Sequence, residues 1–236
     1  MAHRAAVTGV FSYSGRFIAE ELLARGWEVT ALGRGRPLAA DPLAARVRFR
    51  PLLLDDEPAM ASSLSDCEVL LNTYWIRFER GGATFAEAID RSRRLFRAAR
   101  TAGVQRIVHL SVSNAAPDSP FPYFRSKAAV EDALAQSGLS NAVLRPTLIF
   151  GGRQEILVNN IAWLLRRLPV FLLPDGGRAH VQPVAVHDLA AAAADLAERA
   201  EDVVLDLAGP ETFTFAEFVR LIRDAVHGRA RLLGAP

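Results

Sequence analysis

Two side chains four residues apart, Tyr123 and Lys127, have the types and the spacing that proton transfer requires. Residues at positions i and i+4 share one face of a helix, and the pattern here predicts a helix over residues 123–137. A tyrosine with its ordinary pKa of about 10 is a poor base at neutral pH, and a nearby ammonium group lowers that pKa by favouring the phenolate. Lysines and arginines number 28, and Lys127 is the single lysine, so this position uses an ammonium group where all others use guanidinium. The alternative is a tyrosine packed on a neighbouring loop beside a solvated lysine.

Two serines stand before this helix, at the end of the strand predicted for residues 105–111. Ligands of parallel sheets bind at the carboxyl ends of the strands, so a hydroxyl there can hold a substrate oxygen against Tyr123. Ser111 and Ser113 are the candidates, and the count from the strand favours Ser113. The alternative for both serines is that the hydroxyl makes its hydrogen bonds within a local turn and contacts no ligand. The predicted catalytic set is therefore Ser113, Tyr123 and Lys127.

A glycine-containing turn joins the first predicted strand to the first predicted helix. Gly9 and Gly15 occupy the first and last positions of a Gly-x-x-Gly-x-x-Gly pattern, and Ser12 occupies the middle one. Such a turn leaves free N–H groups at the helix N-terminus, which bind a pyrophosphate, and a last residue without a side chain lets the helix pack close to the strand. The sequence therefore predicts a dinucleotide site, with an ordinary strand–helix turn as the alternative. The residues of this turn assigned to the site are Gly9, Phe11, Ser12, Tyr13, Ser14 and Gly15.

Basic residues follow the second predicted strand, where the adenosine ribose of a dinucleotide would lie. An acid there would bond the 2′-hydroxyl of NAD, whereas an arginine suits the 2′-phosphate of NADP. Arg34 holds this position and Arg36 is a second candidate, so NADP is the expected cofactor and NAD the second choice. Asp55, after the third predicted strand, is assigned to the adenine edge, with capping of the next helix as an equal alternative. Asn72 and Ser111 complete this part of the predicted cofactor site.

Short apolar runs alternate with segments of helical periodicity along the first 150 residues. The predicted strands cover residues 5–7, 27–32, 47–54, 69–74, 105–111 and 141–147, and the predicted helices cover residues 15–25, 84–101 and 123–137. This rhythm predicts an α/β fold with a doubly wound parallel (Rossmann) sheet. Residues 1–150 are predicted to form an NADP-binding domain and residues 151–236 a small substrate lobe. About residues 183–207 of that lobe, including a helix at 188–199 and a seventh strand at 203–207, are expected to return to the main sheet. Further helices are predicted at 154–168 and 215–227.

The composition of the 236 residues is that of a globular protein, with 50% hydrophobic and 23% charged residues. A formal net charge of +2 argues against a strongly basic surface, so no nucleic acid is expected as a partner. The single cysteine, Cys67, rules out an internal disulfide and a cysteine-built zinc site, and no metal site is expected. No apolar run reaches the length of a membrane span. The first residues lack the pattern of a signal peptide, which makes the cytoplasm the expected location.

Two groups of apolar side chains are candidates for the walls of a substrate pocket. The first is expected near the nicotinamide, with plain core as an equal alternative, and consists of Trp75, Phe78, Phe121 and Phe124. The second would favour a small apolar substrate and consists of Trp163, Leu164, Leu168, Phe171 and Leu172.

In these motifs the chain resembles the short-chain dehydrogenase/reductase superfamily. It looks most like the extended-to-atypical branch, which includes NAD-dependent epimerase/dehydratase relatives and the NADP-binding accessory subunit of respiratory complex I. The resemblance is carried by the turn at residues 8–15, the set of Ser113, Tyr123 and Lys127, the segments 144–146 and 150–151, and the segment Val-Ala-Val-His-Asp-Leu-Ala at residues 184–190. Two features depart from the family pattern. Ser12 replaces the middle glycine, and only nine residues separate Ser113 from Tyr123.

The resemblance implies a role for each matching residue. Tyr123 would donate or accept the proton, Lys127 would bind the nicotinamide ribose and tune the tyrosine, and Ser113 would orient the substrate. Tyr123 is assigned, with Lys127, to the cofactor-binding residues as well. Backbone at the end of the sixth strand, Pro146 and Thr147, would meet the nicotinamide. We therefore expect an NADP-dependent oxidoreductase that acts on a small carbonyl or alcohol. Two alternatives stay open: a non-catalytic NAD(P)H-binding redox sensor or assembly factor, and an epimerase or dehydratase with a tightly bound cofactor.

Overall fold

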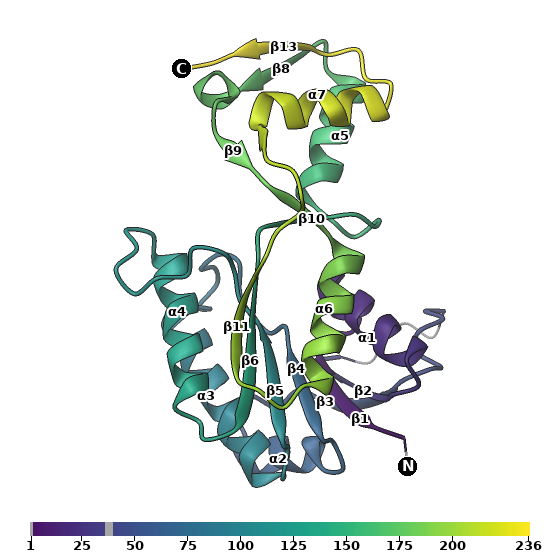
Figure 1. Cartoon of the computed structure of the whole chain (residues 1–236), viewed down its shortest axis with the longest axis vertical. Coiled ribbons are helices and arrows are strands. Elements are labelled where there is room, and N and C mark those ends of the chain that lie inside the picture. Colours follow the sequence, from purple (N-terminus) through teal and green to yellow (C-terminus); the bar gives the residue numbers. More distant parts are fainter. Residues whose placement is uncertain (1, 36–39) are drawn as a thin grey trace. The chain divides into compact units, whose positions relative to one another are not determined.

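Seven parallel strands form the central sheet, in the order β11-β6-β5-β4-β1-β2-β3 (Figure 1). The structure is a computed structural model that describes residues 2–35 and 40–236. The strands of this sheet are β1 (Arg4–Thr8), β2 (Glu28–Gly33), β3 (Arg48–Pro51), β4 (Val69–Asn72), β5 (Arg106–Leu110), β6 (Ser140–Pro146) and β11 (Val203–Leu207). The helices packed around it are α1 (Tyr13–Ala24), α2 (Glu57–Leu64), α3 (Phe85–Thr101), α4 (Pro122–Ala135) and α6 (Val186–Glu198). The predicted α/β fold with a doubly wound parallel sheet is confirmed.

Helices cover both faces of this sheet. Helices α2, α3 and α4 form one layer and α1 and α6 the other (Figure 1). The three middle residues of strand β1, Ala5, Ala6 and Val7, are apolar and fully buried, as expected of a strand between two helical layers. In the second layer, Arg25 at the end of α1 donates to the Asp195 carboxylate of α6 at 2.7 Å. The central strands of the sheet therefore present their ends, and not their faces, to ligands.

The strand order reverses next to β1. Strands β2 and β3 lie on one side of β1, whereas β4, β5, β6 and β11 follow on the other side. In doubly wound sheets the crevice at this switch point, outside the carboxyl ends of the strands, is where ligands bind. The carboxyl ends of β1 and β4 are Thr8 and Asn72. The topology therefore directs attention to the residues just after these two.

The chain divides into two compact units, one formed by residues 1–146 and 187–207 and the other by residues 147–186 and 208–236. The second unit contains β7 (Leu148–Phe150), α5 (Leu157–Arg167), β8 (Val170–Leu173), the 3-10 turn η1 (Pro174–Gly177), β9 (His180–Val181), β10 (Pro183–Ala185), β12 (Phe213–Thr214), α7 (Phe215–Ala225) and β13 (Arg231–Gly234). Its strands form three separate pairs, and its core is centred on Leu165 of α5 and Val219 of α7, both fully buried. Helix α6 and strand β11 belong to the first unit.

Several element boundaries differ from those predicted. Helix α1 begins two residues earlier than expected, at Tyr13, and strand β3 spans four residues where eight were predicted. Helix α2 was not among the predicted ranges; it is only eight residues long and depends on a cap, because the Asp56 side chain accepts a hydrogen bond from the Ala59 N–H. The short strands of the second unit have two to four residues each, which is too few for a periodicity to be read from the sequence.

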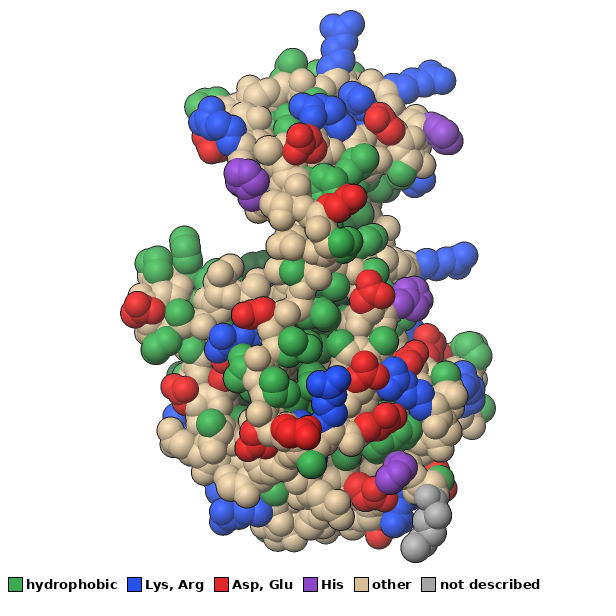
Figure 2. All heavy atoms as spheres, in the orientation of Figure 1, with side chains coloured by type: hydrophobic (Ala, Val, Ile, Leu, Met, Phe, Trp, Pro, Cys, Tyr) green, Lys and Arg blue, Asp and Glu red, His purple; other side chains and the backbone are tan. Residues whose placement is uncertain are grey.

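Charged side chains of both signs are interspersed over the visible face of the molecule (Figure 2). Within the described residues, no helix combines the length and the apolar character that crossing a bilayer takes.

Candidate functional site

The turn between β1 and α1 is as tight as the sequence predicted. Gly9 has a φ of 68°, a conformation that favours glycine. A Cβ on Gly15 would lie 2.3 Å from the Gly9 carbonyl oxygen, so only glycine allows the helix to approach the strand this closely. Ser12, in place of the middle glycine, is accommodated because its backbone N–H and its hydroxyl both donate to the Gly9 carbonyl, at 2.8 and 2.6 Å.

The N-terminus of α1 has the properties of an anion site. Ser12 is the N-cap residue, but its hydroxyl donates to the Gly9 carbonyl, and among the described residues no side chain makes a capping hydrogen bond to this helix. The first turn also carries no acidic residue. The N–H groups of an uncapped helix start and the positive end of the helix dipole attract a phosphate. Ser12 is exposed, and Phe11, Tyr13 and Ser14 are half-buried around it. These residues fit the pyrophosphate of a dinucleotide.

Buried polar side chains join the carboxyl ends of β1, β4 and β5 directly beneath this turn. The Thr8 hydroxyl accepts from the Thr73 N–H at 2.7 Å, and the Thr73 hydroxyl donates to the Thr8 carbonyl at 2.5 Å. The Asn72 carbonyl oxygen accepts from the Thr8 hydroxyl at 3.3 Å, and its amide nitrogen contacts His109 Nδ1 at 3.1 Å. Asn72, predicted to bind the cofactor, is completely buried, so its amide holds the floor of the site together.

His109 lies within this floor and is completely buried. Burial, together with the nearby Lys127 ammonium, places the pKa of His109 well below its ordinary range. The imidazole is therefore neutral at physiological pH and is no source of a proton there.

Arg34 follows β2 directly and is exposed, as a residue that binds a 2′-phosphate must be. The second candidate, Arg36, lies outside the described residues. Asp55 is held by Arg91 of α3 through two hydrogen bonds of 3.0 and 2.9 Å, and this guanidinium lowers the pKa of the Asp55 carboxyl. The alternative that Asp55 caps the next helix is wrong, because the capping side chain is that of Asp56.

Lys127 points from α4 to the end of β5. Its Nζ donates to the Leu110 carbonyl at 2.8 Å, and Lys127 as a whole is only 2% exposed. The ring of Trp75, in the segment after β4, lies over the amine with its centroid 4.9 Å from Nζ. Burial lowers the pKa of Lys127 to about 7, against the favourable field of Glu131 one helical turn further along α4.

Tyr123 stands one turn before Lys127, at the start of the same helix. It is half-buried, and its ring makes edge contacts with Trp75 and Phe85 at centroid distances of 6.4 and 6.1 Å. The sequence predicted a lowered pKa, but the pKa of Tyr123 is raised, because burial of the phenol outweighs the opposing field of Arg77. In this arrangement the tyrosine is protonated at neutral pH.

The two serines after β5 have different surroundings. The Ser111 hydroxyl donates to the buried Glu131 carboxylate, which also accepts from Arg145 Nε at 3.1 Å. Ser111 is thus engaged in tying β5, α4 and β6 together. Ser113 is half-buried and its N–H donates to the Pro146 carbonyl at 2.9 Å, which places it beside the end of β6.

Glu131 was not singled out from the sequence. Its spacing from Lys127 could have identified it, because an acid four residues after Lys127 lies on the same inward face of the helix.

The predicted nicotinamide contacts fall in separate units. Pro146 is the buried last residue of β6 in the first unit. Thr147 belongs to the second unit, where its hydroxyl donates to the Gln182 carbonyl.

The predicted pocket walls are only partly buried. Phe78 and Phe121 are 76% and 62% exposed, so plain core is wrong for these two. Trp75 is half-buried, and Phe124 makes an edge contact with Tyr123 at 5.5 Å. In the second group Trp163, Leu168 and Leu172 are exposed, and Leu164 and Phe171 are half-buried.

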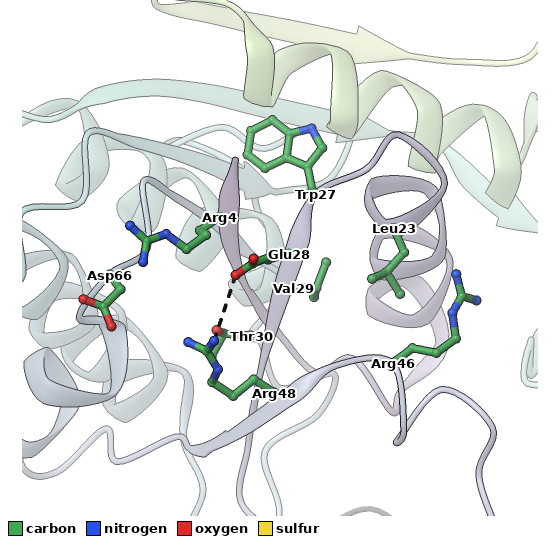
Figure 3. Close-up of a pocket in the computed structure, with 9 residues that line it drawn as sticks. All are labelled: Arg4, Leu23, Trp27, Glu28, Val29, Thr30, Arg46, Arg48 and Asp66. Atoms are coloured by element: carbon green, nitrogen blue, oxygen red, sulfur yellow. Dashed lines mark ion pairs between the residues drawn. The ribbon is translucent and has the colours of Figure 1, made fainter. Parts of the chain in front are cut away.

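A cavity of about 240 Å³ lies at the opposite, amino-terminal ends of β1 and β2 (Figure 3). Arg4 and Glu28, the first residues of these strands, line it together with Arg48, which pairs with Glu28 at 3.9 Å. The catalytic candidates lie at the carboxyl ends of the strands, so this cavity is no part of their site.

Comparisons with known proteins show the family and the fold of the chain. A family model described as NAD(P)H-binding matches residues 12–158, more than half of the chain. The NADH dehydrogenase (ubiquinone) 1 alpha subcomplex subunit 9, mitochondrial, of Arabidopsis thaliana is 26% identical over 242 residues, which cover 98% of this chain and 60% of that protein. The chain spans about three fifths of the length of the first curated relatives it matches.

Solved enzyme structures share the fold. UDP-N-acetylglucosamine 4-epimerase from Bacillus cereus superposes with a TM-score of 0.81 at 18% identity, over 99% of this chain and 85% of that one. Triphenylmethane reductase from Citrobacter sp. superposes with a TM-score of 0.82 at 20% identity, over 99% of this chain and 79% of that one.

Proposed function

The chain belongs to the NAD(P)H-binding family, and on that premise we propose that it is an NADP-dependent oxidoreductase of the short-chain dehydrogenase type, acting on a small carbonyl or alcohol. The observation that carries the proposal is the position of Tyr123 and Lys127. Helix α4 holds Lys127 at the carboxyl end of β5 and Tyr123 against Trp75, which follows β4, so both belong to the end of the sheet at which α1 also begins. A proton donor and a dinucleotide site at one sheet edge are the two parts that hydride transfer needs.

Bound NADPH would supply the hydride, and the side chains of this chain would manage the substrate oxygen. Because burial raises the pKa of Tyr123, its Oη carries a proton at neutral pH and suits donation to a carbonyl oxygen. The Ser113 hydroxyl would hold that oxygen in place. Lys127 Nζ would bind the ribose and stabilise the phenolate once the proton has left. These roles make carbonyl reduction the favoured direction.

The preference for NADP rests on Arg34. An exposed arginine directly after β2 can bind a 2′-phosphate with two parallel hydrogen bonds. The described residues at this position, residues 33–35, include no acid that would favour the 2′-hydroxyl of NAD.

Calorimetric titration with NADP⁺ and NAD⁺, followed by NADPH oxidation across a panel of small aldehydes and ketones, tests the proposal. Tyr123→Phe keeps the ring contacts and removes the proton, so we expect turnover to fall by roughly 10²- to 10⁴-fold with the affinity for NADP⁺ unchanged. Equal turnover in wild type and Tyr123→Phe would refute the catalytic role.

A second candidate is a protein that binds NAD(P)H without turning it over. The specific observation in its favour is that Lys127 is 2% exposed and covered by Trp75. The Arabidopsis relative is named as a subunit of NADH dehydrogenase, which agrees with a binding role. This candidate predicts tight NADPH binding with no oxidation by any carbonyl of the panel.

The cytoplasm remains our proposed location, although the Arabidopsis relative carries the word mitochondrial in its name. Fractionation of cells that express the protein would decide between the two compartments.

A further inference from the structure

Trp75 closes the space around the Lys127 amine. Its indole lies over Nζ at 4.9 Å, stacks on Phe85 of α3 at 5.9 Å with an angle of 9°, and meets the edge of Tyr123 at 6.4 Å. On the other side Nζ donates to the Leu110 carbonyl. The result is an amine with 2% exposure, although a ligand must reach it for the proposed chemistry.

This closed arrangement leaves hydrogen-bonding groups without partners. An ammonium group has three donors, and one of them is used on Leu110. Within the described part of the chain, the Trp75 Nε1–H is buried and has no acceptor. A buried N–H without an acceptor is costly, and the gain from the cation–π and ring contacts is of similar size. The closed state is therefore held by a small margin that a bound ligand can reverse.

We propose that Trp75 is a positioning residue for Lys127: it holds the amine against Leu110 in the free protein and turns aside when a nucleotide ribose binds the amine. The displaced indole then finds an acceptor for its Nε1–H. Because Trp75 also contacts the Tyr123 ring, the same movement changes the surroundings of the proton donor. Cofactor binding and activation of Tyr123 are thereby coupled. The displacement of Trp75 by a bound nucleotide rests on the proposed function, whereas the shielding of the Lys127 amine by Trp75 in the free protein does not.

The single lysine of the chain makes the covered state measurable. An amine-acylating ester labels Lys127, and mass spectrometry of its peptide gives the rate, compared with a free lysine derivative in the same solution. A full pH profile separates two quantities: the plateau rate reports access to the amine, and the midpoint reports its pKa. Glu131 and His109 are the titratable groups that act on Lys127, and both are kept in every variant.

Trp75→Leu is expected to raise the plateau rate at least tenfold and to move the midpoint upward from about 7, because water reaches the amine. Trp27→Leu is the matched control, since Trp27 is also a partly enclosed tryptophan, but its ring packs on His3 at 5.0 Å and lines the cavity at the amino-terminal end of the sheet. It should leave both quantities unchanged. Equal plateau rates in wild type and Trp75→Leu would overturn the inference.

The nucleotide arm uses Trp27→Phe combined with Trp163→Phe, which leaves Trp75 as the single tryptophan. NADP⁺ should raise the acrylamide quenching of Trp75, whereas 2′,5′-ADP, which lacks the nicotinamide ribose, should bind without this change. Binding of NADP⁺ with unaltered quenching would refute the coupling. If neither dinucleotide binds, the proposed function fails, while a labelling difference between wild type and Trp75→Leu would still support the role of Trp75.

Discussion

Replacing Lys127 with methionine should change how the stability of the protein depends on pH. Methionine has a similar length and no charge, so Lys127→Met removes the titrating group with little change in packing. The pKa of Lys127 falls from an ordinary 10.5 to about 7 in the folded chain. Between these two values the unfolded chain binds a proton that the folded chain does not. The free energy of unfolding therefore rises with pH over this window, and below it the buried ammonium group is a constant penalty.

The size of the effect follows from the two pKa values. Each pKa unit corresponds to about 1.4 kcal/mol, so the full shift of the pKa from 10.5 to about 7 is worth on the order of 5 kcal/mol. Between pH 7 and pH 9 the folded lysine loses the rest of its proton while the unfolded one keeps it, so stability should rise by about 2 kcal/mol. Cys67, Tyr74 and Tyr123, whose pKa values are raised by burial, titrate in both proteins and cancel in the comparison.

Urea unfolding of wild type and Lys127→Met at pH 7 and pH 9, without nucleotide, measures this difference. The wild type should gain stability relative to the variant by about 2 kcal/mol on going to pH 9, with equal m-values in the two proteins. Parallel pH dependence in the two proteins would show that the amine is hydrated or paired in the folded state, and would refute the reasoning.

Three further substitutions test other parts of the site. Gly15→Ala should abolish nucleotide binding and lower the melting temperature, because its Cβ would lie 2.3 Å from a backbone oxygen, whereas Gly35→Ala, with open space around it, should preserve the melting temperature. Arg34→Ala should weaken NADP⁺ binding by roughly tenfold to a hundredfold with little effect on NAD⁺, measured by calorimetry; an equal loss for both would contradict a 2′-phosphate contact. Glu131→Gln, which leaves the Arg145 guanidinium without its carboxylate, should destabilise the protein by about 1–3 kcal/mol in urea unfolding, and an unchanged midpoint would argue against that ion pair.

Local features of the sequence were sufficient to predict the fold. Alternating apolar runs and helical segments gave the parallel sheet, because burial of both faces requires continuous apolar strands. Gly9 and Gly15 marked the turn, since a positive φ and a close backbone approach are demands that one residue type satisfies. Tyr123 and Lys127 share a helix face through spacing alone. Element ends and the short α2 were missed, because they depend on caps and single contacts.

The contacts among the site residues depend on the tertiary structure. Trp75 meets Lys127, and Ser111 meets Glu131, through contacts between segments that the fold brings together. The sequence placed an ammonium group near Tyr123 and so predicted a lowered pKa, but Lys127 donates to the Leu110 carbonyl instead, and burial of the phenol raises the pKa of Tyr123. The order of residues fixes which groups can lie on one face. Desolvation and packing, which set their charge and their access to ligands, depend on every element that surrounds them.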